Sequence, residues 1–253
     1  MTTKYKAPTV KKAFQILSLI SRADSGLKIS DLSKTLGLSK STVHGITAAL
    51  EEQGAIIRDT RAKRYSLGFT LFELGRSVYS RIDLKDLARP LMEDLMQKTE
   101  QSVFLGIKNR NRVTVLDIVE SMNDLKITSP IGASLPLLAG ALGKVFLAAM
   151  DAEQANTLLD SKKLPRYTEK SITDPDRYWE EIRTAQQNGY ATDDEEYIPG
   201  VRAVASSING EKNLMSAIWV VGFKMNMDNG KMDVIARETK HTAEAISLKV
   251  RNV

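Results

Sequence analysis

The spacing of apolar residues between positions 29 and 53 predicts two short helices joined by a tight turn. Leu32 and Leu36 are four residues apart, so they share one face of the first helix, for which Ser30 is the expected N-cap. Gly37 follows and supplies the backbone freedom that a tight turn between helices requires. We therefore expect the first helix to pack its leucines against the second.

The second helix is predicted to begin after Ser39, a good N-cap, and to run to about Gln53. Val43, Ile46 and Leu50 follow the i, i+3, i+7 spacing of a buried face. The candidate contact residues at the exposed N-terminal part are short hydrogen-bond donors and one cation: Ser39, Lys40, Ser41, Thr42, His44 and Thr47. Such groups suit phosphate oxygens and base edges in a DNA major groove. The alternative is a small helical pair without a nucleic-acid partner.

A short hairpin is predicted directly after this helix. Residues 55–58 and 64–67 have the composition of two strands, and the turn between them carries Arg61 and Lys63, with Arg64 at the start of the second strand. A hairpin with a basic tip after a recognition helix is typical of a winged helix-turn-helix. The three cations are candidates for contacts with backbone phosphates or a minor groove.

The rest of the chain is predicted to mix helices and strands. A helix at 69–79 is apolar enough to pack against a neighbour, such as another subunit. We expect further helices at 84–98, 137–150, 151–159, 174–189 and 228–250, and strands at 103–107, 113–118, 125–128, 190–192, 201–208 and 214–222. Asn209-Gly210 is a good hairpin turn between the last two strands. This pattern predicts an α+β fold, with residues 1–68 as the winged helix-turn-helix domain, 69–85 as a linker helix and 86–253 as a ligand-sensing domain.

Charge is divided unevenly between these parts. Residues 1–68 hold 12 Lys and Arg against 5 Asp and Glu, whereas the remainder holds 24 against 26. The whole net charge of +5 therefore comes from the part that carries the helix-turn-helix. This distribution is expected for a protein that binds a polyanion with salt-sensitive affinity.

Composition excludes several kinds of site. The chain has no cysteine, which excludes disulfides, thiolate zinc sites and cysteine nucleophiles, and it has only two histidines, His44 and His241. No apolar run approaches the roughly 18 residues of a membrane span, and no signal-peptide pattern is present, so we expect a cytoplasmic protein without membrane association.

The carboxylates of residues 193–196 could attract a divalent cation, but we expect one to line a pocket and others to form ion pairs, for example with Arg202.

Several short motifs occur in a characteristic order along the chain, beginning within the recognition helix. They are Ser39–His44, Leu137–Lys144, Ile172–Pro175, Gly189-Tyr190, Asp193–Glu196, Gly200–Arg202 and Gly222. In this order, along nearly the whole chain, they resemble the IclR family of bacterial transcription regulators. The resemblance implies a GAF-like effector-binding domain, a homodimer or homotetramer, and binding to a palindromic operator in double-stranded DNA.

The resemblance also implies an effector pocket. By position, Ala141 and Leu142 would offer backbone N–H groups to a ligand carboxylate at a helix N-terminus. Asp193 would be a polar pocket residue, and Ile127 and Leu135 would form apolar wall.

This chain departs from the family pattern at positions that bear on specificity. Many members have histidine where Leu138 stands and cysteine where Ala203 stands. In members that bind small oxoacids, serines line the strand where Trp219 and Val221 stand. A pocket lined by these apolar residues favours a larger, flatter or aromatic organic acid over a small polar one.

A second departure lies in the recognition helix, where Gly45 replaces a common arginine. Glycine in a helix interior lowers helix stability by about 1 kcal/mol relative to alanine.

These features predict a ligand-responsive transcription regulator of a catabolic operon, such as a repressor, with no cofactor, metal or catalytic residue. One alternative is a ligand-independent DNA-binding oligomer. Another is an enzyme that carries a DNA-binding module; catalytic GAF-like proteins use cysteine, and this chain has none.

Overall fold

The computed structural model describes residues 7–79, 84–160, 164–209 and 214–251. The chain forms two compact units, Met1–Ile82 and Asp83–Val253. None of the helices among the described residues is long and apolar enough to cross a membrane. The predicted turn at Asn209-Gly210 lies partly outside the described residues.

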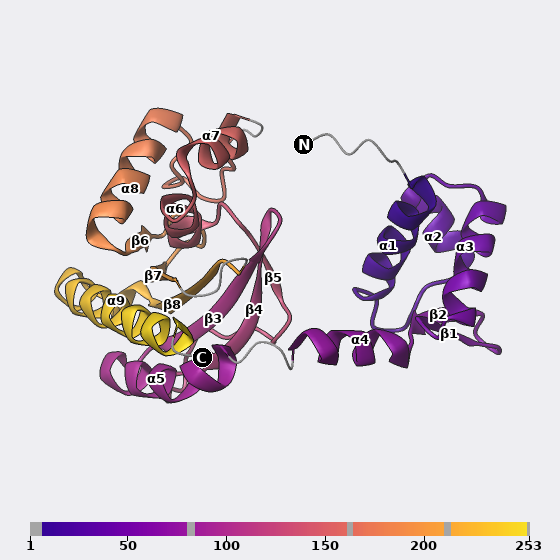
Figure 1. Cartoon of the computed structure of the whole chain (residues 1–253), viewed down its shortest axis with the longest axis horizontal. Helices are drawn as coiled ribbons and strands as arrows, with labels where there is room; N and C mark the ends of the chain where they lie inside the picture. Colours follow the sequence, from indigo (N-terminus) through magenta and orange to yellow (C-terminus); the bar gives the residue numbers. More distant parts are fainter. Residues whose placement is uncertain (1–6, 80–83, 161–163, 210–213, 252–253) are drawn as a thin grey trace. The chain divides into compact units, whose positions relative to one another are not determined.

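The first unit is a helix-turn-helix with a wing (Figure 1). Its elements are α1 (Pro8–Ile20), α2 (Ile29–Leu36), α3 (Lys40–Glu52), β1 (Ile56–Asp59), β2 (Arg64–Leu67) and α4 (Phe69–Tyr79). Ile16, Leu32, Val43 and Ile56 are fully buried in a single small core, which Tyr65 of the wing completes. This core holds the second helix of the motif, α3, at a fixed angle to α2.

The cap of α2 differs from the prediction. The helix begins one residue before Ser30, and its N-cap is Lys28, whose backbone N–H donates to the Asp31 carboxylate at 3.0 Å. Asp31 stabilises this end because a carboxylate in the first turn also interacts favourably with the helix dipole. The other end of α2 is as expected: Gly37 has φ of 63°, a left-handed conformation that favours glycine.

The second unit is built on a six-stranded antiparallel sheet of strand order β5-β4-β3-β8-β7-β6. The strands are β3 (Ser102–Asn109), β4 (Arg112–Val119), β5 (Ser134–Pro136), β6 (Ala191–Asp194), β7 (Val201–Ile208) and β8 (Ser216–Phe223). The helices are α5 (Leu84–Thr99), α6 (Gly140–Ala148), α7 (Ala152–Asp160), α8 (Pro175–Asn188) and α9 (Asn229–Arg251), with a 3₁₀ turn η1 at Lys224–Asn226. Together with the helix-turn-helix unit, this confirms the predicted α+β class.

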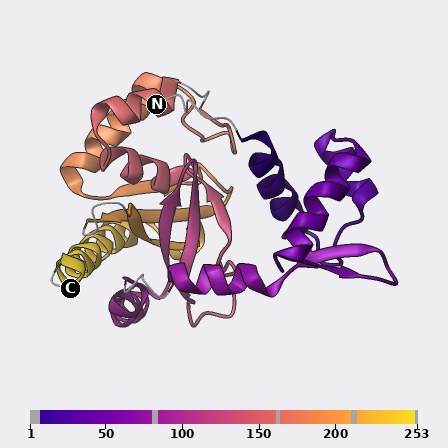
Figure 2. The same cartoon turned by 45° about the vertical axis from the view of Figure 1, so that its right-hand side comes forward.

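Helices cover both faces of this sheet. α5 and α9 pack together on one face, and α6 packs on the other, with α8 against it (Figures 1 and 2). Capping side chains set two of the helix starts: Asp151 accepts a hydrogen bond from the backbone of Gln154 at 2.7 Å, and Asp174 accepts one from Arg177 at 2.8 Å. The face that α6 covers also carries the cavity described below.

Two predicted elements differ in the structure. Residues 125–128 do not form a strand; the short strand that pairs with β4 is β5 instead. Of the two apolar residues in 125–128, Ile127 lines the cavity and Leu125 is exposed. The helix predicted from Leu137 begins only at Gly140, because Leu135 to Pro136 still pair with β4.

Candidate functional site

The N-terminus of α3 is defined by a cluster of hydroxyl groups. The Ser39 Oγ accepts a hydrogen bond from the Thr42 backbone N–H at 3.1 Å and lies 2.8 Å from the Thr42 Oγ1 and 3.0 Å from the Ser41 Oγ. Lys40 and His44 flank this cluster, and both side chains are exposed. Donors for phosphate oxygens and base edges are therefore gathered at the solvent-facing start of one helix.

Thr47 is not part of this surface, contrary to the prediction. Its side chain is 0% exposed, and its Oγ1 donates to the carbonyls of Val43 at 2.9 Å and His44 at 3.0 Å. Thr47 lies one turn after the buried Val43, so it falls on the core face of α3. Because its hydroxyl is satisfied inside the protein, Thr47 supports the helix and contacts no DNA from this position.

The wing presents two of the three predicted cations to solvent. The Asp59 Oδ1 accepts hydrogen bonds from the backbones of Arg61 at 2.8 Å and Ala62 at 2.9 Å, which shapes the turn. Arg61 and Lys63 at the tip are exposed, whereas Arg64 is half-buried and donates to the Gly26 carbonyl at 2.8 Å. Arg64 therefore ties the wing to the body of the unit.

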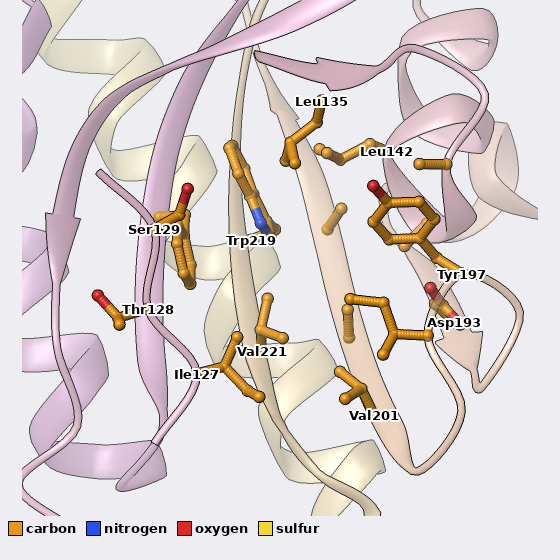
Figure 3. Close-up of a pocket in the computed structure, with 16 residues that line it drawn as sticks. Ile127, Thr128, Ser129, Leu135, Leu142, Asp193, Tyr197, Val201, Trp219 and Val221 are labelled. Atoms are coloured by element: carbon orange, nitrogen blue, oxygen red, sulfur yellow. The ribbon is translucent and has the colours of Figure 1, made fainter. Parts of the chain in front are cut away.

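The second unit contains a cavity of about 200 Å³ between the sheet and the N-terminus of α6. Eight of the nine predicted effector residues line it: Ile127, Leu135, Ala141, Leu142, Asp193, Ala203, Trp219 and Val221. Figure 3 shows Trp219 between Thr128 and Ser129 on one side and Tyr197 and Asp193 on the other. The sequence prediction therefore located most of a real cavity.

Leu138 does not line this cavity. It is buried in a separate apolar cluster with Leu147, Ile172 and Ile182, on the side of α6 that faces away from the sheet. Leu135 lies in β5 and lines the cavity, whereas the turn at residues 136–139 places Leu138 against Tyr178 and Ile182 of α8. The predicted role of Leu138 in the cavity wall is therefore wrong.

Several lining residues were missed by sequence reasoning. They are Phe104, Thr128, Ser129, Ala139, Tyr197, Ile198, Val201 and Ala205. Phe104 matters most, because it pairs across strands with Trp219 and stacks on it with ring centroids 5.4 Å apart. A Cβ at Gly106 would lie 2.8 Å from the Trp219 ring, so the glycine makes room for the indole. No signal in the sequence identifies this pair, since its register depends on β3 and β8 meeting.

Asp193 is the charged group of the cavity. Its side chain is 6% exposed, and its Oδ1 accepts a hydrogen bond from the Glu196 backbone N–H at 2.6 Å. A Cβ at Gly140 would overlap the carboxylate, and Gly140 has φ of 50°, so only glycine fits at this first residue of α6. Burial, with a smaller contribution from the Glu196 carboxylate, raises the pKa of Asp193 to about 6, against the lowering effects of the Glu196 backbone hydrogen bond and the Lys144 ammonium.

The turn that follows Asp193 is held by a buried lysine. Lys144 of α6 is 1% exposed, and its Nζ donates to the Glu196 carboxylate at 2.6 Å, the Glu181 carboxylate at 2.8 Å and the Thr192 carbonyl at 2.9 Å. All three ammonium hydrogens therefore have an acceptor. Sequence reasoning missed Lys144, although a lone cation in an apolar helix signals a buried ion pair.

The acidic run at 193–196 does not converge on one point. Asp194 pairs with Arg202 at 2.5 Å, as predicted, and Glu195 pairs with Lys170 at 2.6 Å and with Lys224. The two pairs of Glu195 with Lys170 and Lys224 lower the pKa of Glu195 to about 2 and keep it ionised. Among the residues that the structure describes, no group of three or more His, Asp or Glu side chains is arranged to hold a metal ion.

Comparison with known proteins places both units in one family. The profile of the IclR helix-turn-helix domain matches residues 9–60, and that of the bacterial transcriptional regulator IclR C-terminal domain matches residues 76–248. The HTH-type transcriptional regulator XynR of Escherichia coli (strain K12) is 30% identical over 240 residues, covering 94% of this chain and 95% of XynR. The chain belongs to the IclR family.

Solved structures of IclR proteins share the fold. A crystal structure of an IclR transcriptional regulator from Alicyclobacillus acidocaldarius has a TM-score of 0.82 at 24% identity, covering 97% of this chain and all of the other. An IclR homolog from Microbacterium hydrocarbonoxydans, complexed with 4-hydroxybenzoate, has a TM-score of 0.78 at 21% identity and the same coverage. The protein is thus a DNA-binding transcription regulator of the IclR family and not an enzyme.

The raised pKa of Asp193 predicts a specific pH dependence of stability. From an ordinary value of 3.8, the pKa is about 6 in the folded state, so the folded protein binds the proton more tightly. Wild-type stability should then fall as pH rises from 4 to about 6 and level off above, by up to about 3 kcal/mol from this group. Asp193→Asn should lack this loss, as measured by urea unfolding of both proteins from pH 4 to 8.

A matched control for this experiment is Asp194→Asn, one residue along. Ion pairing with Arg202 lowers the pKa of Asp194, so its contribution is present at neutral pH and is lost as pH falls. The two variants should therefore differ from wild type with opposite signs at neutral pH. A stability difference for Asp193→Asn that does not change with pH would contradict the assignment.

The buried pairing of Lys144 predicts a large loss on its removal. Lys144→Met should cost about 3–5 kcal/mol of unfolding free energy, because the Glu196 carboxylate is left buried without its partner. The double variant Lys144→Met/Glu196→Gln should recover part of that loss, as a double-mutant cycle would measure. Lys170→Met, which removes the ion pairs of a solvent-exposed lysine with Asp194 and Glu195, should cost much less than Lys144→Met. Equal losses at positions 144 and 170 would refute the distinction.

Proposed function

We propose that this IclR-family protein is a ligand-responsive regulator in which α3 and the wing bind a palindromic operator and the cavity binds an effector. The effector is a small organic acid with apolar or aromatic character. We further propose a cytoplasmic homodimer or homotetramer that controls a catabolic operon. In this scheme, effector binding changes how well the DNA-binding units of the oligomer fit their half-sites.

The observation that carries the effector proposal is the composition of the cavity. Its walls are apolar and include the stacked Phe104 and Trp219, which suit a flat ligand. None of the described lining residues is basic, so a ligand carboxylate would depend on the backbone N–H groups of Ala141 and Leu142 at the start of α6. This arrangement favours an acid that gains most of its affinity from an apolar body.

Asp193 adds a requirement for a hydrogen-bond donor on the ligand. An ionised Asp193 accepts hydrogen bonds, so a ligand hydroxyl would donate to it. It would repel a second carboxylate on the same ligand. A hydroxylated aromatic acid offers both a carboxylate and a donor on a flat ring. The Microbacterium hydrocarbonoxydans homolog, which shares the fold, was solved with 4-hydroxybenzoate, a molecule of this class.

The effector proposal predicts selective thermal stabilisation. We expect 4-hydroxybenzoate or a related aromatic acid at saturating concentration to raise the melting temperature, and short oxoacids such as pyruvate and glyoxylate to leave it unchanged. Trp219→Ser should weaken binding of the aromatic acid at least about tenfold, since it removes the stacked wall. Trp179→Ser, the same change outside the cavity, should retain the wild-type affinity. Stabilisation by oxoacids alone, or by neither panel, would count against the proposal.

The DNA-contact proposal predicts separable effects within α3. A duplex enriched by the wild-type protein from a random-sequence library serves as the probe. His44→Ala and Thr42→Ala should each weaken binding to this duplex about tenfold, and Arg61→Ala should reduce the salt dependence of binding. Thr47→Ala should lower thermal stability but change the affinity less than twofold, because Thr47 is buried. Unchanged affinity in both His44→Ala and Thr42→Ala would refute the proposed contact surface.

A further inference from the structure

Gly45 lies in the interior of the recognition helix, where glycine is a weaker helix former than alanine. α3 runs without interruption from Lys40 to Glu52, and Gly45 has no positive φ. The backbone at this residue therefore adopts an ordinary helical conformation that alanine would stabilise. The special conformational freedom of glycine, which Gly37 uses in the preceding turn, is not used at Gly45.

Packing inside the protein does not require glycine at this position either. A Cβ built on Gly45 meets no atom within 4 Å, and the residue is exposed. This contrasts with Gly143 of α6, where a Cβ would overlap the Tyr178 hydroxyl, and with Gly106, where it would press on Trp219. The described part of the chain thus gives no internal reason for a helix-weakening residue at position 45.

The neighbours of Gly45 supply a second observation. Ser41 lies one turn before it and Ala48 lies one turn after it on the same exposed face. The donors at the start of α3 are also short, since Ser39, Ser41 and Thr42 place their oxygen atoms only one bond beyond Cβ. Such short groups reach base edges only when the helix backbone itself lies close to the floor of the groove.

We infer that Gly45 is a specificity-determining residue, whose missing side chain lets α3 approach base edges closely enough for Ser41 and Thr42 to contact them. This inference rests on the proposed role of α3 as the recognition helix. A side chain at position 45 would hold the helix away from the groove floor. Contacts by the longer Lys40 to phosphates would tolerate that displacement, whereas contacts by the short hydroxyls would not.

The test is Gly45→Ala in the full-length protein, because the inference predicts opposite changes in stability and specific binding. The variant should melt at a temperature about 2 °C or more above wild type, since alanine is the better helix former. It should bind the duplex enriched by wild type from a random-sequence library at least about tenfold more weakly. Its affinity for an unselected duplex of equal length should stay within twofold, because phosphate contacts dominate there.

Gly230→Ala is the matched control, as Gly230 is an exposed glycine in the first turn of α9, with no atom closer than 3.5 Å to a built Cβ. It should leave binding to both duplexes unchanged. Wild-type affinity of Gly45→Ala for the enriched duplex would overturn the inference, as would an equal loss on both duplexes. If the wild-type protein enriches no sequence, the proposed recognition function itself fails, which is a distinct result.

Discussion

The buried ammonium of Lys144 is the interaction on which the geometry of the cavity in the second unit depends. Its acceptors come from β6, from the turn after β6 and from α8, so three separate segments meet at one charge. A buried ammonium is tolerable only when its hydrogens are all accepted, which leaves these segments little freedom to move apart. The turn carries Tyr197 and Ile198, and α6 carries Ala141 and Leu142, so one ion-pair network sets the spacing between two walls of the cavity.

The same network explains why the ionised form of Asp193 is disfavoured. Lys144 pairs directly with Glu196 and Glu181, so its charge is already matched by two carboxylates. Burial of Asp193 beside Gly140 raises its pKa to about 6, although hydrogen bonds from backbone N–H groups act in the opposite direction. Apolar walls increase the cost of ionising Asp193 because they exclude water. A ligand that donates a hydrogen bond to Asp193 would lower that cost, which is a physical reason for a polar group on an otherwise apolar effector.

Local signals in the sequence predicted much of the fold, and distant contacts account for the errors. The starts of α3, α7 and α8 were predicted correctly because each depends on one capping side chain, at Ser39, Asp151 and Asp174. Residues 125–128 were predicted as a strand from their apolar alternation, yet Ile127 packs into a cavity that exists only after the sheet has formed. The partners of Lys144 could not be identified for the same reason, since they lie 37 to 52 residues further along the chain. Position within the family, rather than periodicity, located Trp219 and Asp193, and it misplaced Leu138 where the chain bends before α6.

Glycines show how the two units meet different demands with the same residue. Gly140 is required twice, by its positive φ and by the Asp193 carboxylate that fills the space of a side chain. Gly106 is required once, by the Trp219 ring. In both places, another part of the protein occupies the vacated volume, so the cost of glycine is offset within the second unit. At Gly45, no atom of the first unit occupies that volume. The cost there is not offset by any contact among the described residues, and under the proposed DNA-binding role of α3 the groove of the operator would fill the space.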